Sequence, residues 1–138
     1  MRDERTEGET SRLVLIVDDD RITRLVVGSV VQSYGCAVDT AGSVKEALEC
    51  LERRVYDLIM IDGHLPDGSG TDIARYVRQG RFPLDTPIIA FSSDDDSGHV
   101  KALLASGASH FVRKPISRSE IRALLLEFGL MGEPSAAD

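Results

Sequence analysis

Short apolar runs that alternate with amphipathic segments constrain the fold of this chain most strongly. A continuous apolar run such as Leu13 to Val17 is typical of a parallel strand that is covered on both faces. In the segment that follows, Ile22, Leu25, Val26 and Val30 recur at helical spacing. The alternation repeats, and strands are expected at residues 13–17, 36–40, 58–61, 88–91 and 109–112. Five strands joined to five helices by short loops predict an α/β doubly wound parallel sheet.

Polar residues follow four of the predicted strands, at the point where each strand ends. They are Asp18, Asp19 and Asp20 after the first strand, Asp62 after the third, Ser92 after the fourth and Lys114 after the fifth. Because open parallel sheets bind their ligands at the carboxyl ends of the strands, we expect these side chains to meet. Asp62 also precedes a turn rich in glycine and proline, which would present its carboxylate to solvent. Asp20 is expected to cap the following helix instead.

These residue types suit phosphoryl chemistry. The carboxylate of Asp62 can attack phosphorus and form an acyl phosphate. Adjacent acids such as Asp18 and Asp19 can hold a hard divalent cation such as Mg²⁺, one directly and one through water. Phosphoryl transfer depends mainly on positioning and on neutralising the equatorial oxygens. Mg²⁺, the ammonium of Lys114 and the hydroxyl of Ser92 could each contribute to that task.

The composition excludes several classes of function. The formal charge is −7 and no basic stripe is visible, so direct nucleic-acid binding is not expected. No apolar run approaches the roughly 20 residues of a membrane span, so no membrane insertion is expected. Cys36 and Cys50 lie outside any CxxC or zinc-type spacing. We expect reduced thiols in a cytoplasmic protein, with a disulfide or a redox sensor as the alternative.

Found together and in this order, the motifs resemble the receiver domain of two-component response regulators. The resemblance covers Arg12 to Phe128 and is carried by Asp18-Asp19, Asp62 with the downstream Leu65 to Gly70, Ser92, and Lys114-Pro115. It implies a flavodoxin-like sheet with strand order 2-1-3-4-5. It also implies a phosphoryl donor, which would be a phosphohistidine on a sensor histidine kinase or on a histidine phosphotransfer protein. A downstream protein effector would receive the signal.

The resemblance assigns a role to each acid. Asp62 would be the phosphoacceptor. Asp19 and Asp62 would coordinate Mg²⁺ directly, the backbone carbonyl of His64 would be the third protein ligand, and Asp18 would act through water. A domain of this kind is not an enzyme for another substrate, but it catalyses its own phosphorylation and dephosphorylation.

The resemblance also implies a conformational switch. Ser92 would bind one phosphoryl oxygen and Lys114 would pair with another. Phe111 matches the aromatic switch position and would turn inward when Ser92 moves toward the phosphate. The face formed by the fourth helix, the fifth strand and the fifth helix would then change, and it could support a phosphorylation-dependent dimer.

Some positions depart from the commonest receiver pattern. Phe111 lacks the hydroxyl of the frequent tyrosine, and Gly63 adds local freedom after the phosphoacceptor. His64 and Asp94 occupy the two positions that flank the phosphoryl site, and the hypothesis is that they set the lifetime of the acyl phosphate. A transition-metal role for His64 is disfavoured because no second His or Cys lies at ligand spacing. His99 is expected to be a surface residue, as is His110.

Two other functions and one boundary question stay open. A pseudo-receiver would bind a partner without taking phosphate, and a haloacid-dehalogenase-type phosphatase would use Asp18 as its nucleophile. The length of 138 residues predicts one domain over residues 12–128, with a disordered tail at 1–11 and a flexible tail at 129–138. The polar start at Met1 favours a stand-alone regulator over a receiver cut from a longer chain.

Overall fold

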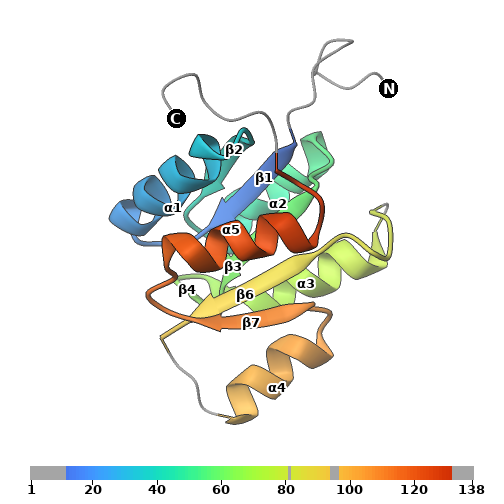
Figure 1. Ribbon diagram of the computed structural model, residues 1–138. Helices are drawn as coiled ribbons and strands as arrows, with labels where there is room; N and C mark the ends of the chain where they lie inside the picture. The colour runs from blue at the N-terminus through green and yellow to red at the C-terminus, as the bar shows by residue number, and fades with distance from the viewer. Residues whose placement is uncertain (1–11, 81, 94–96, 132–138) are drawn as a thin grey trace.

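A five-stranded parallel sheet forms the centre of the computed structural model, which describes residues 12–80, 82–93 and 97–131 (Figure 1). Its strands are β1 (Leu13–Val17), β2 (Ala37–Ala41), β3 (Leu58–Asp62), β6 (Ile88–Ser92) and β7 (His110–Arg113). They lie in the order β2-β1-β3-β6-β7, which confirms the predicted order 2-1-3-4-5. The predicted tail at 1–11 and most of the one at 129–138 lie outside the described residues.

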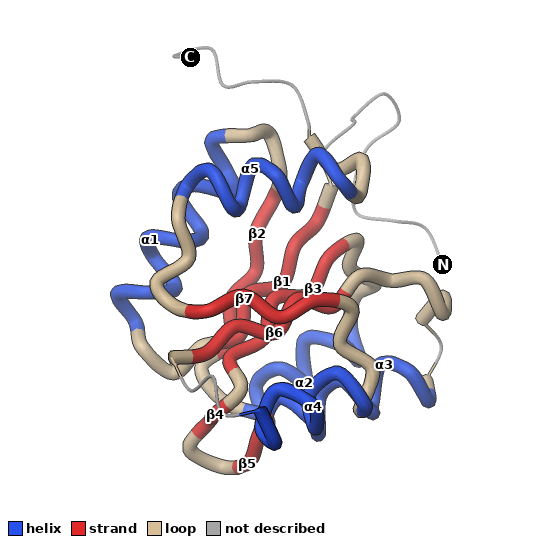
Figure 2. Tube along the Cα trace, turned by 60° about the horizontal axis from the view of Figure 1, so that its bottom comes forward, coloured by secondary structure: helices blue, strands red, loops and turns tan. Residues whose placement is uncertain are grey.

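Helices cover both faces of the sheet (Figure 2). On one face, α1 (Arg21–Ser33) and α5 (Arg118–Glu127) pack on a core that includes Ile16, Met60 and Phe91. On the other face lie α2 (Val44–Arg53), α3 (Gly70–Gln79) and α4 (Ser97–Ala105). No helix among the described residues is long and apolar enough to cross a membrane.

The buried face of α1 differs from the one that the apolar spacing suggests. Ile22, Leu25 and Val26 are 63%, 55% and 56% exposed, whereas Val27 and Val31 are buried. The reason is Gly28, which also faces inward and lies against the side chains of β1 and β2. Glycine is not counted among the large apolar residues that define the spacing, so the pattern misses the face on which it lies. A glycine nevertheless lets a helix approach a sheet closely.

The end of the domain also differs from the prediction. Leu130 is only 6% exposed, its backbone N–H donates to the carbonyl of Leu125 over 2.8 Å, and its own carbonyl accepts from the thiol of Cys36. Gly129 has φ +68° and makes the turn that returns the chain to the core. The folded part therefore continues to Met131 rather than ending at Phe128. Cys36 and Cys50 are both free thiols, as expected.

A short hairpin that the sequence did not predict follows β3. Its strands are β4 (His64–Leu65) and β5 (Gly68–Ser69), which pair antiparallel and lead directly into α3. The carboxylate of Asp67, at the turn, accepts the backbone N–H groups of Val44 (2.8 Å) and Lys45 (3.0 Å) at the start of α2. The chain that leaves the carboxyl end of β3 is thus fastened to the neighbouring helix.

Candidate functional site

Asp62 is the last residue of β3, and it lies at the carboxyl edge of the sheet with 5% of its surface exposed. Its Oδ1 accepts the backbone N–H of His64 over 3.1 Å, and its Oδ2 lies 3.2 Å from Nζ of Lys114. The carboxylate therefore has two donors that hold it in one orientation at the end of a buried strand.

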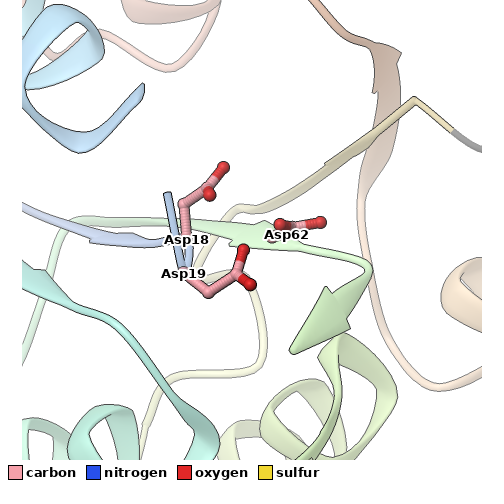
Figure 3. A group of neighbouring side chains, drawn as sticks. All are labelled: Asp18, Asp19 and Asp62. Carbon is pink, nitrogen blue, oxygen red and sulfur yellow. The ribbon is translucent and has the colours of Figure 1, made fainter. Parts of the chain in front are cut away.

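Asp18 and Asp19 follow β1, the neighbouring strand, and they differ in environment. Asp18 is fully buried, its Oδ1 accepts the N–H of Asp20 over 2.8 Å, and its Oδ2 lies 2.6 Å from Nζ of Lys114. Asp19 is exposed. One oxygen from each of Asp18, Asp19 and Asp62 lies within 4.8 Å of the others, and Figure 3 shows the three carboxylates gathered at the strand ends.

The third acid of the run, Asp20, has the separate role that the sequence predicted. Its carboxylate accepts the N–H of Ile22 and the hydroxyl of Thr23, which caps α1. The Thr23 hydrogen bond is the main cause of a lowered pKa for Asp20. Asp20 thus fixes the start of α1 rather than joining the acidic cluster.

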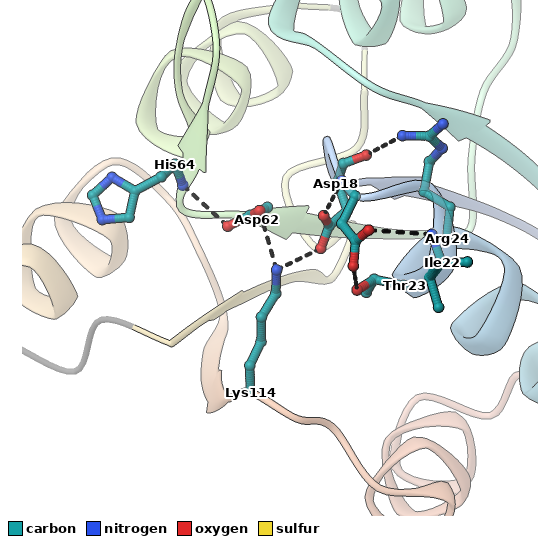
Figure 4. A network of polar contacts seen from close by, with 8 residues as sticks. Asp18, Ile22, Thr23, Arg24, Asp62, His64 and Lys114 are labelled. Carbon is teal, nitrogen blue, oxygen red and sulfur yellow. Dashed lines mark hydrogen bonds and ion pairs between the residues drawn. The ribbon is translucent and has the colours of Figure 1, made fainter.

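Lys114 connects the acids of the two strands. Its ammonium lies between Asp18 and Asp62, as Figure 4 shows, and its backbone N–H donates to the carbonyl of Ser92 over 2.9 Å. The Lys114–Pro115 peptide is cis, which decides a question that the sequence left open. The arrangement brings together the residues predicted to meet after the first, third and fifth strands.

The electrostatics follow from burial and from these pairings. Burial is the main cause of a raised pKa for Asp62, and it outweighs the opposing effects of the His64 N–H and of Lys114. Burial alone would lower the pKa of Lys114, but its pairing with Asp18 and Asp62 raises it instead. Lys114 is therefore a permanent cation at neutral pH, fixed beside the carboxylate of Asp62.

The acidic cluster fits a hard divalent cation. Three carboxylates and one ammonium leave two net negative charges (−3 + 1 = −2). All the side-chain donors are carboxylate oxygens, which Mg²⁺ prefers to nitrogen or sulfur ligands. A divalent cation would balance the charge of the cluster.

The remaining predicted residues are distributed around this edge. Ser92 is the last residue of β6 and is buried, one position beyond Phe91, which pairs with Asp62. Phe111 lies in β7 opposite Ala90 and is half-buried. Asp94 lies outside the described residues.

One contact near the site was not predicted. The rings of His64 and His99 stack with their centroids 4.3 Å apart and an interplanar angle of 6°. His64 therefore has a second histidine beside it in the fold, and His99 is half-buried rather than a plain surface residue. No sequence spacing could reveal this pair, because only the packing of α4 on the chain after β3 brings the two rings together.

Comparisons with known proteins agree with this geometry. A family model described as the response regulator receiver domain matches residues 14–126. The autoinducer 2 sensor kinase/phosphatase LuxQ of Vibrio harveyi is 30% identical over 120 residues, which are 87% of this chain and 14% of that protein. The signal transduction histidine-protein kinase BarA of Escherichia coli K12 is 27% identical over 88% of this chain and 13% of its own length. This chain thus spans a small part of these relatives.

Solved structures are similar over most of this chain. The chemotaxis response regulator CheY4 of Vibrio cholerae has 27% identity and a TM-score of 0.80, over 86% of this chain and 99% of that one. The receiver domain of the sensor histidine kinase PA1611 of Pseudomonas aeruginosa PAO1 has 26% identity and a TM-score of 0.78, over 86% and 97% of the two chains. In that structure a magnesium ion is coordinated in the active site cleft.

Proposed function

This chain belongs to the family of response regulator receiver domains, and we propose that Asp62 is the residue on which it accepts a phosphoryl group. The observation that carries the proposal is the position of the Asp62 carboxylate. It lies at the end of β3 beside two further acids, and Lys114 is 3.2 Å away. A nucleophile, a cation site and a fixed positive charge are thereby present within one edge of the sheet.

The proposed reaction is a transfer between two nucleophiles. A carboxylate oxygen of Asp62 attacks the phosphorus of a phosphohistidine, a P–O bond forms, and the P–N bond breaks with its electron pair returning to the imidazole. Asp19, Asp62 and the His64 carbonyl would hold Mg²⁺ directly, and Asp18 would act through water. The bound ion would neutralise phosphoryl oxygens. Lys114 would exchange its contact with Asp62 for one with a phosphoryl oxygen.

The signal would travel from the phosphoryl group to a partner-binding face. The Ser92 hydroxyl would bond another phosphoryl oxygen, and Phe111 would turn inward as Ser92 moves. These two shifts would bias α4, β7 and α5 toward a second arrangement that an effector or a second copy recognises. His64 and Asp94 would set how long the acyl phosphate lasts before water hydrolyses it.

The exposed apolar part of α1 supports a protein as the phosphoryl donor. Ile22 and Val26 line an open groove whose other walls include Lys114, Pro115 and Ile116. The groove therefore continues from the proposed phosphoryl site onto an apolar surface. We assign it to an amphipathic helix that carries the phosphohistidine of a sensor kinase or of a phosphotransfer protein, because such a helix would bury the apolar residues while reaching Asp62.

The alternatives gain no comparable support. A phosphatase of the haloacid dehalogenase type would need Asp18 as its nucleophile, but Asp18 has no exposed surface, and the family model that matches residues 14–126 describes receiver domains. A pseudo-receiver would not require the intact cluster of Asp18, Asp19, Asp62 and Lys114. The two free thiols support the proposal of a cytoplasmic location.

Phosphotransfer from isolated histidine kinases and phosphotransfer proteins tests the proposal. With Mg²⁺ present, label should pass from the donor's phosphohistidine to this chain and become sensitive to hydroxylamine, as acyl phosphates are. Asp62→Asn should accept no label, whereas Asp39→Asn, a control outside the acidic cluster, should accept it normally. Transfer to Asp62→Asn at the wild-type rate would refute the assignment.

A further inference from the structure

The chain just after the proposed phosphoacceptor is fitted closely to α4. A Cβ on Gly63 would lie 2.5 Å from Nε2 of His99 and 3.3 Å from Cδ1 of Leu103. The ring of His99 therefore occupies the space that any other side chain at position 63 would need. Gly63 is required for this contact, a role in addition to the local freedom that the sequence suggested.

The same contact fixes the side chain of His64. Its backbone N–H donates to Asp62, so its Cα lies next to the proposed phosphoryl site. Its ring, however, points away from Asp62 and Lys114, as Figure 4 shows, and stacks on His99. A long, exposed side chain that could reach over the site is held beside α4 instead.

We propose that His99 is a positioning residue that holds His64 out of the path by which phosphorus is approached, an inference that rests on the proposed role of Asp62. Phosphoryl transfer needs the attacking and leaving atoms in line. When Asp62 takes the phosphoryl group, the donor leaves along the direction opposite the carboxylate oxygen. When water hydrolyses the acyl phosphate, it arrives along that same direction. A side chain that enters this space slows both reactions.

A steric role and a chemical role of His64 would change the two rates differently. If a released His64 acted as a general base, it would speed hydrolysis, because it would take a proton from water. It would not speed phosphorylation by acetyl phosphate, whose leaving acetate needs no proton. Obstruction slows both reactions, so the two rate constants measured together identify which role operates.

The test uses wild type, His99→Ala, His64→Ala and the double variant, each with acetyl phosphate and Mg²⁺. His99→Ala should slow both phosphorylation and hydrolysis by about two- to tenfold, the size of preference that a stacked aromatic pair provides. The same substitution should have no effect on either rate when position 64 is alanine. His99→Phe, which keeps a flat ring for stacking, should restore both rates toward wild type.

Each other result decides against the inference. The inference is overturned if His99→Ala leaves both rates unchanged, or if it speeds hydrolysis alone. It is also overturned if His99→Ala has the same effect with and without His64, because that result would reveal a general disturbance of α4. If wild type takes no label on Asp62, the proposed function itself has failed. If wild type is labelled normally and the His99 variants behave like it, only the positioning role has failed.

Discussion

At the scale of single residues, the carboxylate of Asp62 lies where its negative charge is unfavourable for folding. Its carboxylate is buried at a strand end, and burial raises its pKa despite the nearby ammonium of Lys114. A folded-state pKa above the unfolded value means that the ionised group costs stability at neutral pH. The site therefore holds the proposed nucleophile in an ionised form that folding alone does not favour, as is common where charges are placed for function.

Replacing the buried acid should stabilise the metal-free protein. Asp62→Asn should raise the free energy of unfolding at neutral pH, because it removes a buried charge but keeps an acceptor for the His64 N–H. The advantage should shrink as the pH falls through the raised pKa of Asp62, where the native wild type takes up a proton. Urea denaturation at several pH values in the presence of a chelator measures this.

Mg²⁺ provides the control for that experiment. At ten times its Kd, Mg²⁺ should stabilise wild type by about 1.4 kcal/mol and should stabilise Asp62→Asn much less. Asp19→Asn, at an exposed position, should barely change stability without metal but should weaken the effect of Mg²⁺. A loss of metal-free stability in Asp62→Asn would contradict this description of the site.

At the scale of elements, the hairpin after β3 depends on one acidic side chain. Asp67 accepts two N–H groups at the start of α2, and these hydrogen bonds lower the pKa of Asp67. A lowered folded-state pKa means that the stabilisation is fully present above the unfolded value of 3.8 and is lost as the pH falls through the folded value.

Removing that side chain should loosen the hairpin from α2. Asp67→Ala should lower the melting temperature at neutral pH, and Asp67→Asn, which keeps one acceptor oxygen, should lower it less. Glu49→Ala, at an exposed position on the same helix, is the matched control and should change little. Equal melting temperatures for wild type and Asp67→Ala would show that the two hydrogen bonds do not contribute to stability.

Leu130, in the turn after α5, should stabilise the fold through its buried side chain. Leu130→Ala removes a buried side chain and should cost about 2–5 kcal/mol of unfolding free energy. Leu126→Ala, on α5 itself and 49% exposed, should change the stability by less than about 0.5 kcal/mol. Urea unfolding compares the two variants, and similar small losses for both would mean that Leu130 is not part of the core.

These elements show what the sequence could and could not predict. The five strands and the meeting of Asp18, Asp62 and Lys114 could be predicted, because parallel strands end at one edge of a sheet. The inward face of α1 could not, since it depends on a glycine that fits against two strands. The stack of His64 on His99 could not be predicted either, because it arises from the packing of α4.

At the scale of the whole molecule, one edge of the sheet carries the proposed chemistry and α1 carries an exposed apolar surface beside it. The groove between α1 and the chain after β7 joins the two. Phosphorylation by a small donor needs only the edge of the sheet, whereas phosphorylation by a protein donor needs the groove as well. The two kinds of donor can therefore be separated by substitution.

A charge placed in the groove should slow phosphotransfer from a protein donor but not phosphorylation by a small donor. Val26→Glu, at a position 56% exposed, should slow phosphotransfer from a phosphohistidine protein at least about tenfold, since the helix would have to bury an unpaired charge. Its rate with acetyl phosphate should stay at the wild-type value. Val55→Glu, 51% exposed and just before β3, is the control and should leave both rates unchanged. Equal slowing with both donors would indicate damage to the site rather than to a docking surface.

The most direct test of the central claim is to find which carboxylate takes up phosphate. Wild type would be incubated with acetyl phosphate, with and without Mg²⁺, and the acyl phosphate would be reduced with borohydride so that mass spectrometry can locate the modified aspartate. We predict one Mg²⁺-dependent modification, at Asp62, and none in Asp62→Asn. Modification at Asp18, or no modification that depends on Mg²⁺, would contradict the assignment of Asp62 as the phosphoacceptor.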